Sequence, residues 1–321
     1  MLNLKLQREP QQSSLIPGEL LDVVIVGGGP AGLAAGLYAA RAGLNTLLLE
    51  KAAVVGGQAA STALVENCPG CIEGSGAEIA QHMLDRAVKF GMKLVTADVT
   101  AVDLLAVPKM VDTSAGQARA KTIIIATGAQ PSRIGARGEV EFTGRGVMYC
   151  ATCDGPFYKD KHIAVIGGGD SAVQEGNYLT RFASKVTIIH RRDSFRASKV
   201  LQDRVFANPK IEILWNTTVT DIKGGEHVET LVLQNTQNKE SFEFPIDGVF
   251  VYVGLKPNTE MFKGILEMDE RGYIITNDRM ETNVPGVFAA GDVRRKSLRQ
   301  VVTATADGAT AAISADEFLN H

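Results

Sequence analysis

One pattern occurs twice in this chain and constrains its fold more strongly than any other feature. Residues 21–26 form a short apolar run that leads into GGGPAG at 27–32, and residues 163–166 lead in the same way into GGGDSA at 167–172. A helix and a second strand are expected after each turn, over 33–43 and 44–49 in the first unit, and over about 171–182 and 185–189 in the second. This repeat predicts an α/β protein with two Rossmann-like, three-layer nucleotide-binding domains.

Length and composition agree with that expectation. The 321 residues suffice for two domains, at roughly 100–200 residues each. Hydrophobic residues make up 45% and charged residues 21%, as in soluble globular proteins, and the net charge of −3 lacks the basic footprint of a nucleic-acid binder. Polar residues 1–20 read as an N-terminal extension without the apolar core of a signal peptide. We expect a cytoplasmic protein that binds neither nucleic acid nor a membrane.

The first glycine-rich turn has the features of a dinucleotide site. Its glycines permit a tight turn and let backbone N–H groups approach a pyrophosphate at the helix N-terminus. Gly27, Gly29 and Gly32 fill the glycine positions of G-x-G-x-x-G, and Glu50 ends the second strand. An acid at that place accepts hydrogen bonds from a ribose hydroxyl. The first unit is therefore predicted to bind an adenosine with a free ribose; the alternative is an ordinary glycine-rich turn.

The second unit differs at the residue after its second strand. His190 follows Gly167 by 23 residues, the same spacing that separates the acid from the first glycine in the first unit, and Arg191, Arg192 and Arg196 come next. Guanidinium groups bind phosphate through paired hydrogen bonds, whereas a carboxylate would repel a 2′-phosphate. The second unit is therefore predicted to bind NADPH, with a solvated basic turn as the alternative.

Four cysteines form two Cys-x-x-Cys pairs, Cys68/Cys71 and Cys150/Cys153. Without an export signal, this spacing indicates redox or metal chemistry. The second pair lies just before the second unit's first strand and is followed by Asp154. A helix N-terminus there would lower a thiol pKa, and the adjacent carboxyl can exchange a proton with the thiolate. A structural zinc half-site is the alternative, but the two pairs are separated far more widely than in a zinc ribbon.

A nicotinamide carries electrons as a hydride, whereas a disulfide accepts them through thiolate chemistry. Flavin is the cofactor that links the two. An NADPH site and a dithiol in one chain therefore place FAD at the first site.

The sequence resembles the low-molecular-weight thioredoxin reductases, which are FAD-dependent pyridine nucleotide-disulfide oxidoreductases, along nearly its whole length. The motifs that carry the resemblance are GGGPAG at 27–32, GGQ at 56–58, ATG at 126–128, YCATCDG at 149–155, GGGDSA at 167–172, HRRDSFR at 190–196, VFAAGDV at 287–293 and RQVVTA at 299–304.

The resemblance implies a discontinuous FAD domain, 21–129 and 256–321, with an NADPH domain, 130–255, inserted into it and carrying the dithiol. It implies FAD contacts from Gly27, Gly29, Gly32, Glu50, Gln58, Asn67, Gly128, Asp292, Arg299 and Gln300. The residues expected at NADPH are Gly167, Gly169, Asp170, Ser171, His190, Arg191, Arg192 and Arg196. No metal ligand is expected.

The same resemblance implies the roles of the dithiol residues. Cys153 faces the flavin, Cys150 attacks the partner disulfide and Asp154 is the acid. The implied reaction is NADPH-dependent reduction of thioredoxin or a thioredoxin-like protein by a homodimer. The alternatives are the same mechanism serving a peroxidase component or a glutaredoxin-like acceptor, a flavin reductase acting on ferredoxin, and a nucleotide-binding redox sensor that is not an enzyme.

Two segments depart from the family pattern. Pro156 follows the dithiol and leaves Phe157 and Tyr158 as the candidate docking surface for the partner. Residues 68–71 read Cys-Pro-Gly-Cys, where relatives usually have an aromatic residue before Pro-Gly and no cysteine pair. A capping box is expected after this turn, over 75–78. Three interpretations of the pair stay open: small side chains without a redox role, a second oxidisable dithiol near the flavin, or zinc ligands.

Overall fold

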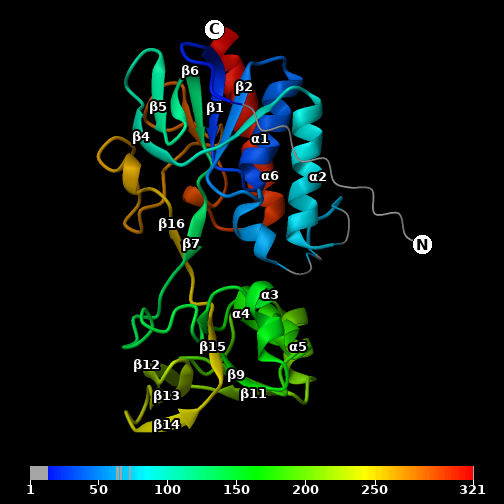
Figure 1. The fold of residues 1–321 in the computed structure, drawn as a ribbon, viewed down its shortest axis with the longest axis vertical. Coiled ribbons are helices and arrows are strands. Elements are labelled where there is room, and N and C mark those ends of the chain that lie inside the picture. The colour runs from blue at the N-terminus through cyan, green and yellow to red at the C-terminus, as the bar shows by residue number, and fades with distance from the viewer. Residues whose placement is uncertain (1–13, 63–64, 66, 72–73, 321) are drawn as a thin grey trace, which may run out of the picture. The chain divides into compact units, whose positions relative to one another are not determined.

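The structure is a computed structural model that describes residues 14–62, 65, 67–71 and 74–320. The chain divides into two compact units, unit 1 with Met1–Gln130 and Pro257–His321, and unit 2 with Pro131–Lys256. It passes between them along β7 (Ala129–Pro131) and β16 (Leu255–Pro257), which pair as a two-stranded sheet (Figure 1). Unit 2 is therefore an insertion between two segments of unit 1.

A seven-stranded sheet forms the centre of unit 1. Its strands are β1 (Leu20–Val26), β2 (Thr46–Glu50), β3 (Lys93–Thr96), β4 (Val99–Asp103), β5 (Lys109–Thr113), β6 (Gly116–Ile125) and β17 (Val287–Ala289). The order β3-β2-β1-β6 is parallel, and β17 extends it along the second half of β6. β5 and β4 continue from the first half of β6 as antiparallel strands. The last strand of the parallel part thus comes from the C-terminal segment of the chain.

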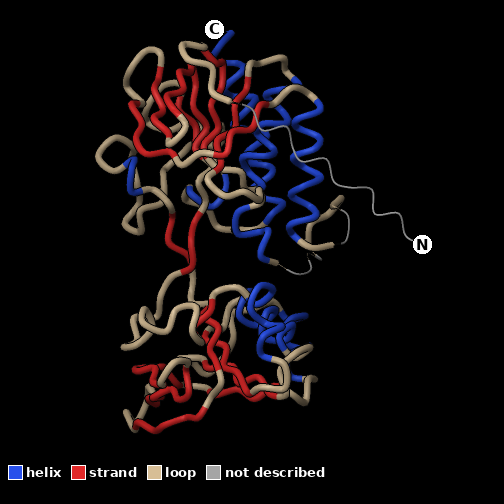
Figure 2. The backbone as a smooth tube through the Cα atoms, in the orientation of Figure 1, coloured by secondary structure: helices blue, strands red, loops and turns tan. Residues whose placement is uncertain are grey.

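Alternating side chains of these strands build two cores, one on each face. Val23 and Ile25 pack among helices α1 (Pro30–Arg41), α2 (Gly76–Lys89) and α6 (Val301–Asn320), which cover one face (Figure 2). Val24 and Val26 face the second core, which includes residues of the short 3₁₀ helices η3 (Glu260–Phe262) and η4 (Gly291–Val293). Burial of each such side chain contributes about 1.5–3 kcal/mol, and the apolar run in β1 follows from burial on both faces.

Local signals explain where the first two helices begin. Gly29 is the N-cap of α1 and Pro30 occupies its first turn, where the missing proline N–H costs nothing. Ser75 caps α2: its hydroxyl accepts the Glu78 N–H and the Glu78 carboxylate accepts the Ser75 N–H. The capping box expected from the sequence is therefore confirmed.

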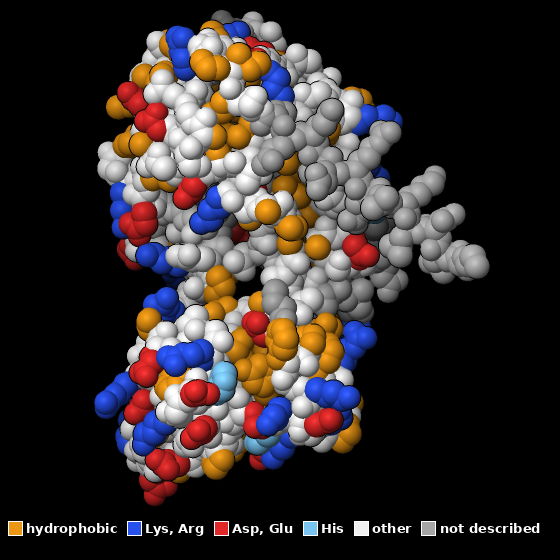
Figure 3. Space-filling view, viewed as in Figure 1, with side chains coloured by type: hydrophobic (Ala, Val, Ile, Leu, Met, Phe, Trp, Pro, Cys, Tyr) orange, Lys and Arg blue, Asp and Glu red, His pale blue; other side chains and the backbone are white. Residues whose placement is uncertain are grey.

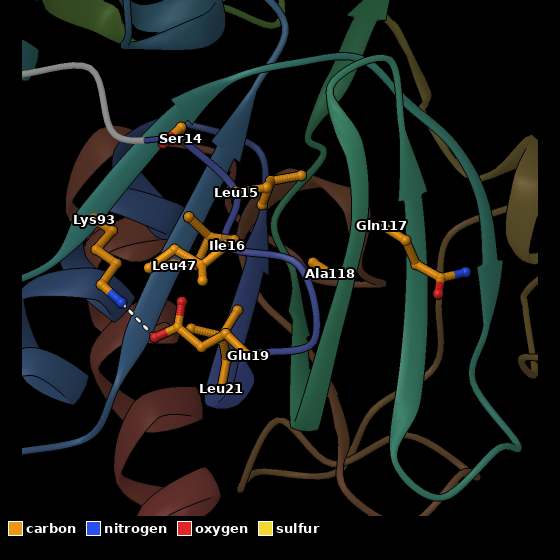
Figure 4. Close-up of a pocket in the computed structure, with 9 residues that line it drawn as sticks. All are labelled: Ser14, Leu15, Ile16, Glu19, Leu21, Leu47, Lys93, Gln117 and Ala118. Atoms are coloured by element: carbon orange, nitrogen blue, oxygen red, sulfur yellow. Dashed lines mark hydrogen bonds and ion pairs between the residues drawn. The ribbon is translucent and has the colours of Figure 1, made fainter.

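The N-terminal residues that the structure describes lie against the sheet of unit 1. Ser14, Leu15 and Ile16 line a shallow hollow beside the Glu19–Lys93 ion pair, whose Oε1 and Nζ atoms are 2.6 Å apart (Figure 4). The hydrogen bond from Lys93, together with one from Asn45, lowers the pKa of Glu19. The predicted extension over 1–20 thus ends in residues held by contacts, while residues 1–13 lie outside the described part.

Unit 2 contains a five-stranded parallel sheet of order β11-β10-β9-β15-β8. The strands are β8 (Val147–Met148), β9 (His162–Ile166), β10 (Lys185–Ile189), β11 (Ile211–Leu214) and β15 (Gly248–Val251). One face packs with α3 (Ala151–Asp154), α4 (Asp170–Leu179) and α5 (Lys199–Phe206). The other packs with an antiparallel sheet of β12 (Thr217–Gly224), β13 (Val228–Asn235) and β14 (Ser241–Pro245).

The predicted α/β class with two Rossmann-like domains is confirmed. Predicted strand 185–189 has the bounds of β10, but the helices differ at their ends. α1 begins at Pro30 rather than at residue 33, because proline fits the first turn. α4 ends at Leu179 rather than near 182, because Thr180 leaves the helix and its hydroxyl bonds the Asn177 carbonyl oxygen. Among the described residues, no helix is both long and apolar enough to cross a membrane.

Candidate active site

The glycine-rich turn of unit 1 lies between β1 and α1 and is held from several sides. Gly27 has φ 108°, and a Cβ there would collide with the carbonyl oxygen of Ala126. A Cβ on Gly32 would collide with the Gly27 carbonyl oxygen, whereas Gly29 faces open space. Gly27 and Gly32 therefore leave no room for a side chain, whereas the backbone at Gly29 is open to a ligand.

Glu50 fixes this turn from the end of β2. Its Oε2 accepts the Gly28 N–H at 2.6 Å and its Oε1 accepts the Ala52 N–H at 2.8 Å. Each carboxylate oxygen has further acceptor capacity. The acid thus lies beside the turn, as expected for a residue that bonds a ribose.

Segments distant in sequence supply buried polar atoms that suit a polar ligand. Asp292 Oδ1, in η4, and Arg299 Nε are buried and have no hydrogen-bond partner within the described part of the chain. Burial raises the pKa of Asp292, opposed by Lys296 and Arg299. The Arg299 guanidinium lies 4.1 Å from the centre of the Tyr273 ring. Unpaired buried polar groups are costly, so these atoms fit the hydroxyl and carbonyl groups of a flavin nucleotide.

The remaining residues expected at FAD come from three other segments of unit 1. Asn67 donates its amide N–H to Gln300 Oε1 at 3.0 Å, which joins the loop before α2 to the start of α6. Gln58 is exposed on the 3₁₀ helix η1 (Gly57–Ser61). Gly128 has φ 63° and faces open space after β6.

The glycine-rich turn of unit 2 repeats the geometry of the first. Gly167 has φ 145°, and a Cβ there would collide with the Tyr252 carbonyl oxygen, while Gly169 faces open space. Ser171 is exposed in the first turn of α4. Asp170 instead faces its own chain: its Oδ1 accepts the Ser198 N–H at 2.6 Å. The turn is thus suited to a second nucleotide, with Asp170 bracing the loop after β10.

The basic residues after β10 gather beside this turn. Arg191, Arg192 and Arg196 are exposed, and within the described residues none of them forms an ion pair with an acid. The Arg196 N–H donates to the Gly168 carbonyl oxygen at 2.7 Å, which draws the cluster toward the turn. Burial lowers the pKa of His190, and the three arginines lower it further. Three exposed guanidinium groups thus follow His190, and such groups can bind phosphate.

The dithiol segment begins a short helix in unit 2. Cys150 is half-buried and disulfide-bonded, and α3 starts at the next residue. The side chain of Cys153 lies outside the described part of the structure. Tyr149 donates its hydroxyl to Glu139 Oε1 at 2.8 Å, and Glu139 also accepts two backbone N–H groups. Burial and this hydrogen bond raise the pKa of Tyr149 to about 12. Tyr149 is therefore neutral, and its bond to Glu139 holds the chain directly before Cys150.

The carboxyl group that follows the dithiol is in a protonation-favouring environment. Asp154 is half-buried, and burial raises its pKa. A carboxyl whose pKa is raised holds a proton more readily and can deliver it to a thiolate. Asp154 thus has the environment expected of the acid.

Comparison with known proteins identifies the family. Residues 21–308 match the family model described as pyridine nucleotide-disulphide oxidoreductase. The thioredoxin reductase of Listeria innocua is 49% identical over 304 residues, covering 94% of this chain and 95% of that protein. The thioredoxin reductase of Bacillus subtilis is also 49% identical over 304 residues, covering 94% and 96%. The crystal structure of Lactococcus lactis thioredoxin reductase superposes with a TM-score of 0.91 at 44% identity, covering 94% and 99%.

The chain belongs to the thioredoxin reductases of the pyridine nucleotide-disulphide oxidoreductase family. It is therefore an oxidoreductase, and the resemblance drawn from its motifs is confirmed. Thioredoxin reductases of this family contain FAD and depend on NADPH, so the expected cofactors are confirmed as well.

The first cysteine pair is oxidised in the structure. Cys68 and Cys71 form a disulfide with Cα atoms 5.4 Å apart. The bridged sulfurs exclude two free thiols and zinc ligation in this structure, whereas a redox role of the pair stays a prediction. Within the described residues, no group of three His, Cys, Asp or Glu side chains could hold a metal ion.

Sequence reasoning did not single out several residues that lie close to the predicted site residues. Glu175, on α4, has its pKa raised by burial to about 7, and burial also raises the pKa of Tyr252, with Glu175 and Asp154 adding to the shift. Glu139 braces Tyr149 from a loop. Asp307, on α6, accepts the Gly291 N–H and pairs with Lys296. These environments depend on how the chain folds back on itself, and no local pattern in the sequence marks them.

Proposed function

We propose that this protein is an NADPH-dependent thioredoxin reductase in which FAD binds unit 1, NADPH binds unit 2, and Cys150 with Cys153 carries electrons to thioredoxin. The observation that carries the proposal is the composition of unit 2. A disulfide-bonded Cys150 with a half-buried acid after it shares one unit with a glycine-rich turn beside exposed arginines that form no ion pair among the described residues. Membership of the thioredoxin reductase family supports the same reading.

The residues proposed to hold FAD fit its parts by their chemistry. The turn with Gly27, Gly29 and Gly32 presents backbone to the pyrophosphate, and Glu50 accepts from the ribose. Asp292 Oδ1 is a buried acceptor in unit 1 that finds no donor among the described residues. Six further assignments complete the proposed site: Gln58, Asn67, Gly128, Arg299 and Gln300 as additional contacts, and Asp307 as the residue that positions η4. When bound, FAD supplies the chemistry that joins hydride transfer from a nicotinamide to reduction of a disulfide.

The residues proposed for NADPH contact two parts of the coenzyme, the pyrophosphate and the 2′-phosphate. Gly167, Gly169 and the start of α4 with Ser171 face the pyrophosphate, by the same argument as in unit 1. Arg191, Arg192 and Arg196 bind the 2′-phosphate, and the buried His190 ring packs against Phe195 of the same loop. Asp170 contributes indirectly, because its carboxylate holds the Ser198 N–H.

The proposed thiol chemistry uses three side chains of unit 2. The Cys150 thiolate attacks one sulfur of the thioredoxin disulfide, and the other thioredoxin sulfur leaves as a thiolate that takes a proton from Asp154. Cys153 then attacks Cys150 in the mixed disulfide, which forms the Cys150–Cys153 disulfide and releases thioredoxin as a dithiol. Burial raises the pKa of Asp154, which favours the protonated carboxyl that this transfer needs.

The proposed docking surface lies directly after the dithiol. The Phe157 ring is 81% exposed, and hydrophobic side chains gather over the α3–α4 side of unit 2 (Figure 3). Exposed aromatic side chains are favoured at protein interfaces. Tyr158 is less available, because its ring packs edge-on against Phe250. We propose Phe157 as the main contact for a thioredoxin-like partner, with the enzyme acting as a cytoplasmic homodimer.

The test is NADPH oxidation by the FAD-loaded enzyme with a panel of acceptors. The panel contains thioredoxin, a glutaredoxin and a disulfide-containing peroxidase component. Thioredoxin should give the highest kcat/KM, and Cys150→Ser should abolish protein reduction. A preference for either of the other acceptors, or undiminished turnover by Cys150→Ser, would contradict the proposal.

A further inference from the structure

The Cys68–Cys71 disulfide lies outside the reaction proposed above. It belongs to unit 1, in the loop between η1 and α2, whereas Cys150 belongs to unit 2. Both cysteines are half-buried, and Asn67, Pro69 and Gly70 around them are exposed. A disulfide at the surface is open to attack by a thiolate from another molecule.

Hydrogen bonds that do not involve the sulfur atoms link the described residues around the disulfide. The Cys71 N–H donates to the Cys68 carbonyl oxygen at 3.0 Å, and Gly70, with φ 79°, allows the tight turn. Val65 and Gly74 pair across the base of the loop, where the Val65 N–H donates to the Gly74 carbonyl oxygen at 2.9 Å. The capping box on α2 follows at once. Hydrogen bonds therefore already hold the turn, its base and the helix behind it.

A disulfide that closes so short a loop would also contribute little to the stability of the fold. The two cysteines are three residues apart in sequence. A disulfide stabilises by restricting the unfolded chain, and the restriction is smallest when the closed loop is short. Cys-x-x-Cys is instead the spacing at which one thiol can readily displace a partner from the other. The contacts and the spacing both favour a redox role over a mechanical one.

We propose that Cys68–Cys71 is a second redox site, which exchanges electrons with protein dithiols of the Cys-x-x-Cys class. One thiolate of the dithiol attacks a sulfur of the pair, which breaks the Cys68–Cys71 bond and releases the other sulfur as a thiolate. The second thiol of the partner then attacks the mixed disulfide. The partner leaves as a disulfide, and two electrons and two protons remain on Cys68 and Cys71 as two thiols.

Reduced thioredoxin is the dithiol that the enzyme itself would generate, an identification that rests on the proposed function. The redox state of Cys68 and Cys71, in unit 1, would then respond to reduced thioredoxin, which the dithiol of unit 2 generates. This redox state would follow the ratio of reduced to oxidised thioredoxin.

The experiment uses FAD-loaded Cys150→Ser/Cys153→Ser enzyme, in which Cys68 and Cys71 are the remaining two of the four cysteines. Thioredoxin is reduced chemically, freed of reductant and added in tenfold excess without NADPH. The reaction is quenched with acid, and alkylated cysteines are counted by mass spectrometry. Because NADPH and the catalytic dithiol are absent, this result does not depend on whether the proposed enzymatic reaction occurs.

We expect two alkylated cysteines after reduced thioredoxin and none before it, with reversal by excess oxidised thioredoxin. A thioredoxin that keeps its attacking cysteine but has serine for the second should be trapped as a one-to-one mixed disulfide. The matched control, with serine at all four positions, should give neither alkylation nor trapping. A pair that is alkylated only after denaturation with reductant, or that stays as two thiols in excess oxidised thioredoxin, would overturn the proposal.

Discussion

The two glycine-rich turns have nearly the same backbone but opposite charge beside them. Gly27 and Gly167 both have positive φ, and a Cβ on either would collide with a neighbouring carbonyl oxygen. Beside the first turn, Glu50 accepts the Gly28 N–H. Beside the second, the Arg196 N–H donates to the Gly168 carbonyl oxygen. The fold thus constrains the turn itself, while the residues after the second strand remain free to select the nucleotide.

The helices that follow the two turns differ in the same way. Gly32 closes the first turn against Gly27, whereas Ala172 holds the corresponding place in unit 2 and is fully buried. Three residues later, α1 has the fully buried Ala35 and α4 has Glu175. In α1 the small side chain permits close packing with Gly308 of α6. At the same place α4 accommodates the carboxyl group of Glu175, whose pKa is raised by burial.

The largest effect is expected from removing the positive charge at the second turn. Arg191→Ala/Arg192→Ala should raise the KM for NADPH by roughly tenfold to hundredfold for each arginine lost, because charge-assisted hydrogen bonds contribute about 1.5–3 kcal/mol. The KM for NADH should change little. Steady-state kinetics with both coenzymes measures this difference, and Lys199→Ala, at an exposed lysine paired with Asp203, controls for the loss of a positive charge elsewhere in unit 2. Wild-type enzyme that uses NADH as well as NADPH would refute the assignment.

Exchanges between glycine and alanine test whether the first turn is packed more tightly than the second. Gly32→Ala should destabilise unit 1 by about 2–3 kcal/mol, because the added methyl group must displace backbone rather than a flexible side chain. Gly29→Ala, into open space, should keep stability while weakening FAD binding. Ala172→Gly in unit 2 should lower stability by only about 1 kcal/mol. Thermal unfolding and FAD titration compare the three variants; equal losses for Gly32→Ala and Gly29→Ala would show that the collision does not matter.

The parts of the candidate site that could be predicted from the sequence are those set by local geometry. The glycine turns, the acid or base after the second strand, and Ser75 as a helix cap were all predictable, because each depends on a few neighbouring residues. The disulfide state of Cys68 and Cys71 remained open in the sequence, because free cysteines and bridged cysteines share the same spacing. The Asn67–Gln300 hydrogen bond and the Tyr149–Glu139 anchor depend on which loops meet after folding.

The smallest expected effect is on the pH dependence of stability, and it depends only on the ionisation of Glu175. Burial raises its pKa to about 7, well above the value of about 4.3 in an unfolded chain. Protonated Glu175 therefore fits the folded protein better than the charged form. Its contribution to stability is complete below about pH 4 and is lost as the pH rises through about 7.

The expected loss is about 1–2 kcal/mol between pH 5 and pH 8, less than the full shift implies, because the side chain is only half-buried and water screens its outer edge. In Glu175→Gln this part of the pH dependence should disappear, because the amide does not titrate. Urea unfolding at several pH values measures the difference, with Glu226→Gln as the exposed control. If wild type and Glu175→Gln lose stability in parallel as the pH rises, then Glu175 is already charged at pH 5, and α4 carries a solvated carboxylate rather than a buried acid.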